Sequence, residues 1–250
     1  MKGLQDRVAL VTGAASGIGQ AVALGLAGHG VAIAAIDINL SGAEQTASDI
    51  SSAGGSALAI QCDIVQKEQV DQAVRQTVTK FGQLDIIVNC AGISPLTELE
   101  KIDHDEWQHV LAVNLTAPFL IIQSAWQLLK AAGTKGRIIN IGSLAGQIGG
   151  MAVGLHYTSS KGGLMSMTKQ LARLLAPSGG TANNISPGTT DTPLIQDWPQ
   201  DTKQALLEKI PLGRLGTPLD VAETACFLAS DAAQFITGAT INVNGGMFIA

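Results

Sequence analysis

A phenol and an amine lie four residues apart in the segment Tyr157-Thr-Ser-Ser-Lys161, and Tyr157 is the only tyrosine in the chain. In a helix, this spacing places both side chains on one face, one turn apart. A phenol with a pKa of about 10 keeps its proton at neutral pH, and a nearby ammonium favours the phenolate. The segment therefore predicts a general acid or base, Tyr157, whose pKa is lowered by Lys161.

A serine hydroxyl is expected beside this pair. Ser143 follows the apolar run Arg137–Ile141, which has the composition of a buried strand. The hydroxyl would stand at the carboxyl end of that strand, the edge where open α/β sheets bind their ligands. A tyrosine followed four residues later by a lysine also arises by chance, so the catalytic prediction depends on a cofactor site at the same edge.

A glycine-rich turn, Thr12-Gly-Ala-Ala-Ser-Gly-Ile-Gly19, separates the apolar run 8–11 from an alanine- and leucine-rich helical segment. Strand, glycine turn and helix form the context of a dinucleotide-binding fingerprint. Gly13 would permit the tight turn, Gly17 the approach of a pyrophosphate to the helix N-terminus, and Gly19 close packing of helix on strand. The spacing differs from the standard Gly-x-Gly-x-x-Gly, and a glycine turn without a ligand is the alternative.

Asp37 ends the second apolar run, 31–36, about 20 residues after the glycine turn, where an acid commonly binds the ribose hydroxyls of the cofactor. No lysine or arginine occurs from Val8 through Gln66. A 2′-phosphate would therefore face the Asp37 carboxylate with no cation from this half of the fold. The sequence predicts NAD rather than NADP, and an exposed acid at a strand end is the alternative.

The remaining segments continue the alternation of apolar strands and helices, without a linker or repeat. We predict one α/β domain over residues 1–250, with a substrate loop or lid at about 189–211 that contains a short helix, 202–210. The expected strands are 8–11, 31–36, 57–61, 84–88, 137–141, 182–186 and 240–243, and the expected long helices are 20–29, 67–81, 105–130, 157–176 and 219–230.

Two polar residues leave their roles open. Asp63 follows the third strand, where it could bind the adenine edge or cap the helix that starts near Lys67. Asn114 lies in the middle of the expected helix 105–130 although asparagine is a mediocre helix former. An amide bonded to solvent would be enough to explain it.

The composition narrows the functional class. The chain has 250 residues, 46% of them hydrophobic, and a net charge of -5, which argues against nucleic acid or an anionic membrane as the main partner. Cys62, Cys90 and Cys226 have no metal-binding spacing, so we expect no metal site and a reducing compartment. No stretch of about 18 apolar residues and no signal peptide is evident, so we expect a cytoplasmic protein without a membrane span.

Taken in order, these motifs resemble the short-chain dehydrogenase/reductase family, from about residue 4 to the C-terminus. The matching pieces are Thr12-Gly-x-x-x-Gly-Ile-Gly19, Asp37, Asp63, Asn89-x-Ala-Gly92, Asn114, Ser143, Tyr157-x-x-x-Lys161 and Pro187-Gly188 with Thr192. The resemblance implies a single Rossmann-type, doubly wound domain with a seven-stranded parallel sheet flanked by helices. It also implies NAD-dependent hydride transfer between a secondary alcohol and a ketone.

The resemblance also assigns residue roles. Tyr157 would exchange the proton, Ser143 would orient the substrate oxygen, Lys161 would hold the nicotinamide ribose, and Asn114 would support a water leading to solvent. The implied cofactor-binding residues are Gly13, Ser16, Gly17, Ile18, Gly19, Asp37, Asp63, Ile64, Asn89, Ala91, Gly92, Tyr157, Lys161, Pro187, Gly188, Thr190 and Thr192. The chain departs from the family pattern at Cys90, usually a second asparagine, and at Thr181-Ala-Asn183, usually Arg-Val-Asn.

The substrate is less well defined. The segments 94–102 and 189–211 mix apolar side chains with hydroxyls and carboxylates and carry no basic cluster. We therefore expect a neutral sugar, polyol or cyclic alcohol, with a 3-oxoacyl thioester as the alternative. An epimerase or dehydratase would require a larger C-terminal domain, a silent nucleotide-binding protein would have lost part of the catalytic set, and a purely structural protein would not bind NAD.

The expected last helix, 219–230, and the tail, 246–250, carry more apolar side chains than one face of a helix can bury. Together with the resemblance, this predicts a homotetramer whose tail is covered by a neighbouring subunit. The alternative is a tail that folds back on its own sheet.

Overall fold

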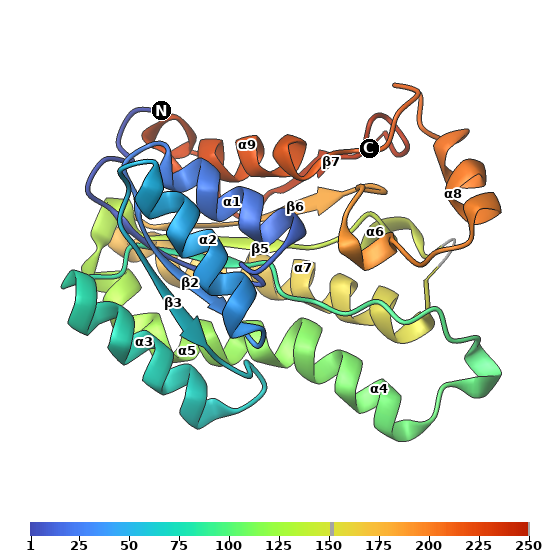
Figure 1. The fold of residues 1–250 in the computed structure, drawn as a ribbon, viewed down its shortest axis with the longest axis horizontal. Coiled ribbons are helices and arrows are strands. Elements are labelled where there is room, and N and C mark those ends of the chain that lie inside the picture. Colours follow the sequence, from blue (N-terminus) through green and yellow to red (C-terminus); the bar gives the residue numbers. More distant parts are fainter. Residues whose placement is uncertain (151–152, 250) are drawn as a thin grey trace.

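The computed structural model describes residues 1–150 and 153–249. Its centre is a sheet of seven parallel strands in the order β3-β2-β1-β4-β5-β6-β7 (Figure 1). The strands are β1 (Val8–Thr12), β2 (Ala32–Asp37), β3 (Ala57–Gln61), β4 (Ile86–Asn89), β5 (Arg137–Ile141), β6 (Thr181–Pro187) and β7 (Thr240–Val243). The Rossmann-type fold class and the seven parallel strands are confirmed.

The central strands are apolar on both faces, as parallel strands covered by helices must be. In β1, Leu10 pairs with Ala34 of β2 on one side and Ile87 of β4 on the other, and all three side chains are buried. The strand order reverses between β1 and β4, which creates a crevice at the carboxyl ends of these strands. The fold therefore opens a ligand site where the sequence analysis expects one.

Two layers of helices cover the sheet. On one face pack α1 (Gly17–Ala27), α2 (Leu40–Ser52) and α9 (Pro218–Ala229); on the other pack α3 (Lys67–Phe81), α5 (Ala117–Ala131) and α7 (Leu155–Leu175). The expectation that α9 carries surplus apolar surface is largely wrong. Val221, Ala222, Ala225, Cys226 and Ala229 are all buried within the chain, against α1 and the sheet, and Phe227 is the half-exposed exception.

The helix expected over 105–130 is present and contains one wide turn. α4 (His104–Leu111) and α5 are joined by one wide turn, Ala112–Thr116, with the hydrogen bonding of a π-helix. Asn114 lies in this turn and is fully buried, so the expected helix is confirmed but widens at Asn114, and the solvent-bonded amide is excluded. His104–Ala131 is long and apolar enough for a membrane span, but α5 buries its apolar face against α3, β4 and β5.

The segments beyond the carboxyl ends of the strands form one side of the molecule, to the right in Figure 1. They include the start of α4, the short helix α6 (Ala145–Ile148) and α8 (Gln200–Leu207). The helix α6 was not predicted from the sequence, and α8 begins two residues before the predicted range of 202–210. Of these, α6 and α8 contribute side chains to a cavity at this edge of the sheet.

Candidate active site

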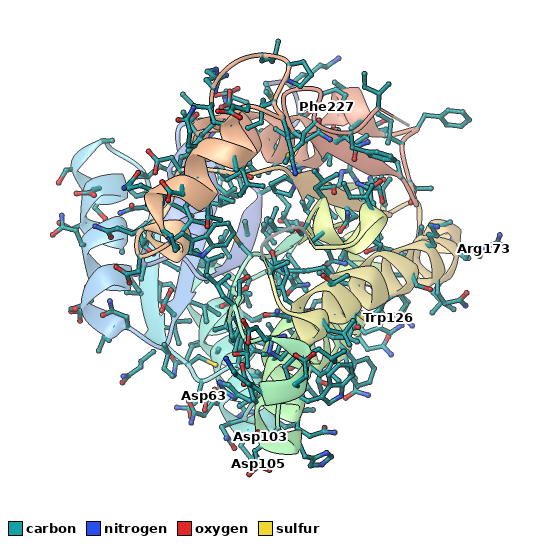
Figure 2. The ribbon with its side chains drawn as sticks, turned by 90° about the vertical axis from the view of Figure 1, so that its right-hand side faces the viewer. Asp63, Asp103, Asp105, Trp126, Arg173 and Phe227 are labelled. Atoms are coloured by element: carbon teal, nitrogen blue, oxygen red, sulfur yellow. The ribbon has the colours of Figure 1, made fainter. Side chains whose placement is uncertain are left out.

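One cavity of about 570 Å³ lies at the carboxyl edge of the sheet. Figure 2 views the molecule from this edge. The cavity is lined by nearly all of the residues predicted for the site: Gly13, Ser16, Gly17, Ile18, Gly19, Asp37, Asp63, Ile64, Ala91, Gly92, Ser143, Tyr157, Lys161, Pro187, Gly188, Thr190 and Thr192. Asn89 and Asn114 do not line it. The fold thus brings together residues spread over most of the chain.

The glycine turn has the shape that a phosphate cradle requires. Gly13 and Gly17 have φ angles of 67° and 56°, a region that favours glycine. A Cβ on Gly19 would lie 2.1 Å from the carbonyl oxygen of Gly13, so a side chain there would force the turn away from α1. Ser16 is the N-cap of α1, and its side chain makes no capping hydrogen bond. Free N–H groups at this helix start suit an anionic pyrophosphate.

Asp37 stabilises the turn as well as lining the cavity. One carboxylate oxygen accepts a hydrogen bond of 3.0 Å from the backbone N–H of Ala15, and the other accepts one of 2.9 Å from Asn39. Each oxygen retains a lone pair for a ribose hydroxyl. Within the part of the chain that the structure describes, Lys161 is the only lysine or arginine that lines the cavity. A 2′-phosphate near Asp37 would have no cation beside it.

Tyr157 and Ser143 present two hydroxyls to one point of the cavity. Their side chains are hydrogen-bonded to each other, and Ser143 Oγ also accepts from the N–H of Ala145 at 3.1 Å. Burial raises the pKa of Tyr157 above its usual value, and the hydrogen bond from Ser143 opposes that increase. The phenol therefore holds its proton at neutral pH and can donate it.

The Lys161 ammonium lies near Tyr157 but is bound to the backbone rather than to the phenol hydroxyl. Its Nζ lies 5.8 Å from the centre of the Tyr157 ring and donates a hydrogen bond of 2.8 Å to the carbonyl of Ile141. Burial lowers the pKa of Lys161 to about 8, so the ammonium carries less charge than an exposed lysine would near that pH. In this structure Ser143, rather than Lys161, lowers the pKa of Tyr157.

Two predicted residues lie behind the cavity wall. The Asn114 amide binds both backbone groups of Ile93, each at 2.9 Å, and donates to Ser160 Oγ at 3.1 Å. Asn89 Nδ2 donates to the side chain of Asn140 at 2.8 Å. Asn114 therefore fixes the loop after β4 against α7, and the water proposed for it stays a prediction.

Asp63 does not cap α3, whose N-cap is Gln66. Its carboxylate instead accepts a hydrogen bond of 3.2 Å from the N–H of Val65 and closes the turn before the helix. Because the side chain also lines the cavity, the adenine-binding alternative stands and the helix-cap alternative does not.

The outer part of the cavity is mainly apolar. Leu194, Ile195 and Trp198 come from the expected lid. Among the hydroxyls and carboxylates of the two expected segments, Thr190 lines the cavity, whereas Thr97, Asp191 and Asp197 do not. Leu206, from the expected lid, also lines the cavity. Three further apolar side chains come from outside the two segments expected to shape the pocket: Ile148, Val153 and Met247. The sequence reasoning overlooked most of these residues. Ile148 and Val153 occupy a short glycine-flanked segment with no helical or strand period, so only their position just after Ser143 could have indicated a role.

Comparisons with known proteins agree with this geometry. Residues 13–248 match a family model described as enoyl-(acyl carrier protein) reductase. The chain is 37% identical over 254 residues to (3R)-3-hydroxyacyl-CoA dehydrogenase of Mus musculus, covering 98% of each. It is 39% identical over 249 residues to 3-oxoacyl-[acyl-carrier-protein] reductase of Synechocystis sp., covering 99% of each.

A solved structure is also similar over its whole length. The crystal structure of 3-ketoacyl-(acyl-carrier-protein) reductase from Brucella melitensis, complexed with NADH, superposes with a TM-score of 0.91 at 34% identity. The match covers 98% of this chain and 100% of that one. The relatives match this chain from end to end, and the chain has the glycine turn and the Ser143–Tyr157–Lys161 cluster in one cavity. It therefore belongs to the short-chain dehydrogenase/reductase family and is an oxidoreductase.

Proposed function

We propose that this protein is an NAD(H)-dependent ketoreductase that interconverts a 3-oxoacyl and a 3-hydroxyacyl thioester. The observation that carries the proposal is the pair of hydrogen-bonded hydroxyls, Ser143 and Tyr157, held inside a largely apolar cavity beside the glycine turn. Two hydroxyls that point to one place can both bind a carbonyl oxygen. One of them, Tyr157, also carries a transferable proton.

The chain's own residues perform the proton chemistry. When bound, the reduced cofactor supplies a hydride to the ketone carbon, and the oxidised form accepts it in the reverse direction. Ser143 donates a hydrogen bond to the substrate oxygen, and Tyr157 gives that oxygen its proton to complete the alcohol. Lys161, which lines the same cavity, is suited to bind the nicotinamide ribose hydroxyls.

NAD rather than NADP is favoured by the surroundings of Asp37. The carboxylate is well placed to accept ribose hydroxyls, and the described cavity lining offers no arginine and only Lys161 as a lysine. The relative that was crystallised with NADH has the same fold over its full length. Glycines at 13, 17 and 19 leave room for the pyrophosphate, while Pro187 and Gly188 border the catalytic end of the cavity.

The apolar walls favour an acyl substrate over our first expectation of a sugar or polyol. A polyol would need several hydrogen-bonding partners, but Leu194, Trp198 and Met247 offer mainly hydrocarbon, and the expected carboxylates lie outside the cavity. The two relatives described above are named for 3-hydroxyacyl and 3-oxoacyl thioesters. Both considerations support the thioester, and neither supports the polyol.

A comparison of substrates tests the proposal. The purified protein is assayed with NADH and a short 3-oxoacyl-CoA, and in parallel with a 2-enoyl-CoA, a cyclic ketone, and a polyol plus NAD. We expect oxidation of NADH with the 3-oxoacyl-CoA at a kcat/KM at least about a hundredfold above the other substrates. A preference for the enoyl thioester would assign reduction of a carbon–carbon double bond instead, and a preference for the polyol would restore the first expectation.

A further inference from the structure

His156 immediately precedes the proposed acid and is completely buried. It occupies the first turn of α7, whose N-cap is Gly154 and which therefore has no capping side chain at the usual position. The imidazole ring supplies the missing acceptor, because its Nδ1 accepts a hydrogen bond of 2.8 Å from the backbone N–H of Tyr157. That N–H is one of those at a helix start that lack a partner within the helix.

The same ring has a second partner that fixes its tautomer. Nε2 lies 3.0 Å from Oε1 of Glu106, near the start of α4. Because Nδ1 accepts from Tyr157, the ring proton lies on Nε2 and is donated to the carboxylate. Thr97 donates to the same carboxylate oxygen at 2.6 Å, and both hydrogen bonds lower the pKa of Glu106. The carboxylate is thus kept ionised as an acceptor.

The backbone provides the space that this ring needs. A Cβ on Gly154 would lie 2.3 Å from Cε1 of His156, closer than any real contact. The φ angle of Gly154 is -66°, which any residue can adopt, so the requirement for glycine is steric. The sequence Gly154-Leu-His156 therefore forms a fitted unit directly ahead of Tyr157.

The other end of the Tyr157 residue is also held by a side chain. Its carbonyl accepts a hydrogen bond of 2.7 Å from Ser160 Oγ, which in turn accepts from Asn114 Nδ2 at 3.1 Å. The Tyr157 backbone is thus clamped between two networks. One reaches it through His156 from Glu106, and the other through Ser160 from the wide turn at Asn114.

The network of His156 also reaches the loop between β4 and α4. Thr97 lies in that loop, and the N–H of Gly154 donates to the carbonyl of Pro95 at 3.2 Å. Ile93 and Ser94, at the start of the same loop, line the cavity. The imidazole is therefore one of three links between the start of α7 and this loop, beside the Gly154–Pro95 hydrogen bond and the Asn114 amide.

We propose that His156 is a positioning residue with two separable roles: its Nδ1 sets the place of Tyr157, and its Nε2–H ties the loop of residues 93–102 to α7 through Glu106. The first role governs the proton transfer and so kcat. The second governs the shape of the substrate cavity and so KM. The inference rests on the proposed acid–base role of Tyr157.

Two substitutions separate the roles. His156→Asn offers an oxygen where Nδ1 lies and so keeps the bond to Tyr157, while it is too short to reach Glu106. His156→Gln can reach Glu106 with its amide but offers no acceptor at the Nδ1 position. For His156→Asn we expect a kcat near that of the wild type. For His156→Gln and His156→Ala we expect a kcat about 10- to 100-fold lower, since small misplacements of an acid cost this much. For His156→Gln we expect a KM near that of the wild type, and for His156→Asn and His156→Ala a KM several-fold higher.

Glu106→Gln and its neighbour Asp105→Asn form a matched pair, because each removes one negative charge from the first turn of α4 and Asp105 is exposed. Only Glu106→Gln should raise KM. The inference would be overturned if all three His156 variants had the same kcat and the same KM. It would also be overturned if activity fell in parallel with thermal stability in all three. Tyr157→Phe is measured alongside. If it keeps wild-type turnover, the proposed function fails; if it is inactive while the His156 variants are normal, only this inference fails.

Discussion

The Lys161 ammonium lies 5.8 Å from the centre of the Tyr157 ring and is bound to the carbonyl of Ile141, not to the phenol hydroxyl. The strand β5 thus holds the lysine, while Ser143, just beyond the end of that strand, holds the tyrosine. Burial of a charged or polar group costs stability, and proteins retain such groups where function needs them. Substitution of Tyr157 or Lys161 should therefore reduce activity without reducing thermal stability.

Tyr157→Phe should reduce kcat by about 10²- to 10⁴-fold, the usual contribution of a positioned acid or base. The ring remains and only the hydroxyl is lost, so thermal stability and NADH binding should change little. Steady-state reduction of a 3-oxoacyl-CoA, with NADH affinity measured separately, checks both parts. Near-normal turnover would remove Tyr157 from the mechanism.

Lys161→Met should abolish most of the activity yet stabilise the fold near neutral pH. Burial lowers the Lys161 pKa from 10.5 to about 8, so the folded protein carries the ammonium at a cost. Methionine has a similar length and no charge, and even after loss of the bond to Ile141 we expect Tm to rise by about 2–4 °C.

The pH dependence gives this second prediction its control. Below about pH 8 the lysine is protonated in both states, so the gain of the variant is constant and largest. Between about pH 8 and 10.5 Lys161 is protonated in the unfolded wild-type chain but largely neutral in the folded one. The free energy of unfolding of the wild type therefore rises with pH over this range. The advantage of the variant should shrink over this window. A Tm difference that stayed constant through it would contradict the assigned pKa.

The sheet and the catalytic cluster could be predicted because their residues carry strong local signals. An uninterrupted apolar run such as Ile33–Ile36 has the composition of a strand buried on both faces, and glycines at 13, 17 and 19 suit few structures other than a tight turn into a helix. The wide turn at Asn114 was not predictable in form. Its cause is tertiary, because the amide binds the backbone of Ile93 and the hydroxyl of Ser160.

The substrate walls were beyond the sequence for a similar reason. Met247 lies near the C-terminus and Ile148 in a four-residue helix, and neither belongs to an amphipathic pattern that indicates where it points. The hydrogen bond between Lys161 and the carbonyl of Ile141 could not be predicted either, because spacing along a helix shows which side chains share a face but not which partner an ammonium will bind. The sequence offered no signal for a role of His156, because that role depends on Glu106, which only the fold brings beside it.

Asp37→Asn should narrow the preference for NADH over NADPH by about tenfold or more, mainly because a repulsive charge is removed. Asparagine keeps an acceptor for the N–H of Ala15, whereas Asp37→Ala would also loosen the glycine turn and weaken both cofactors. Neither variant should bind NADPH tightly, since the described cavity lining holds no arginine and no lysine besides Lys161. Fluorescence titration of both nucleotides checks this. Equal use of the two by the wild type would contradict the interpretation of Asp37.

We expect a homotetramer in which β7, the edge strand of the sheet, and the outer face of α9 meet a second copy. The buried side chains of α9 do not support this assembly; the support comes from Leu219, Phe227 and Ile249, which are 60%, 36% and 84% exposed. Figure 2 shows Phe227 at the surface, on the side away from Asp103 and Asp105. An unpaired strand edge beside apolar side chains is usually covered in solution.

Light scattering at micromolar concentration should therefore give a mass near four times the 25.7 kDa of one chain. Phe227→Glu should lower that mass, because it introduces a charge into the expected contact. Leu99→Glu serves as the control, since Leu99 is 65% exposed in the short helical turn ahead of α4, outside the expected contact, and the change in charge is the same. A wild-type mass of one chain would show that the tail stays exposed or folds back. A tetramer that persists in Phe227→Glu but dissociates in Leu99→Glu would move the contact away from α9 to the α4 side of the molecule.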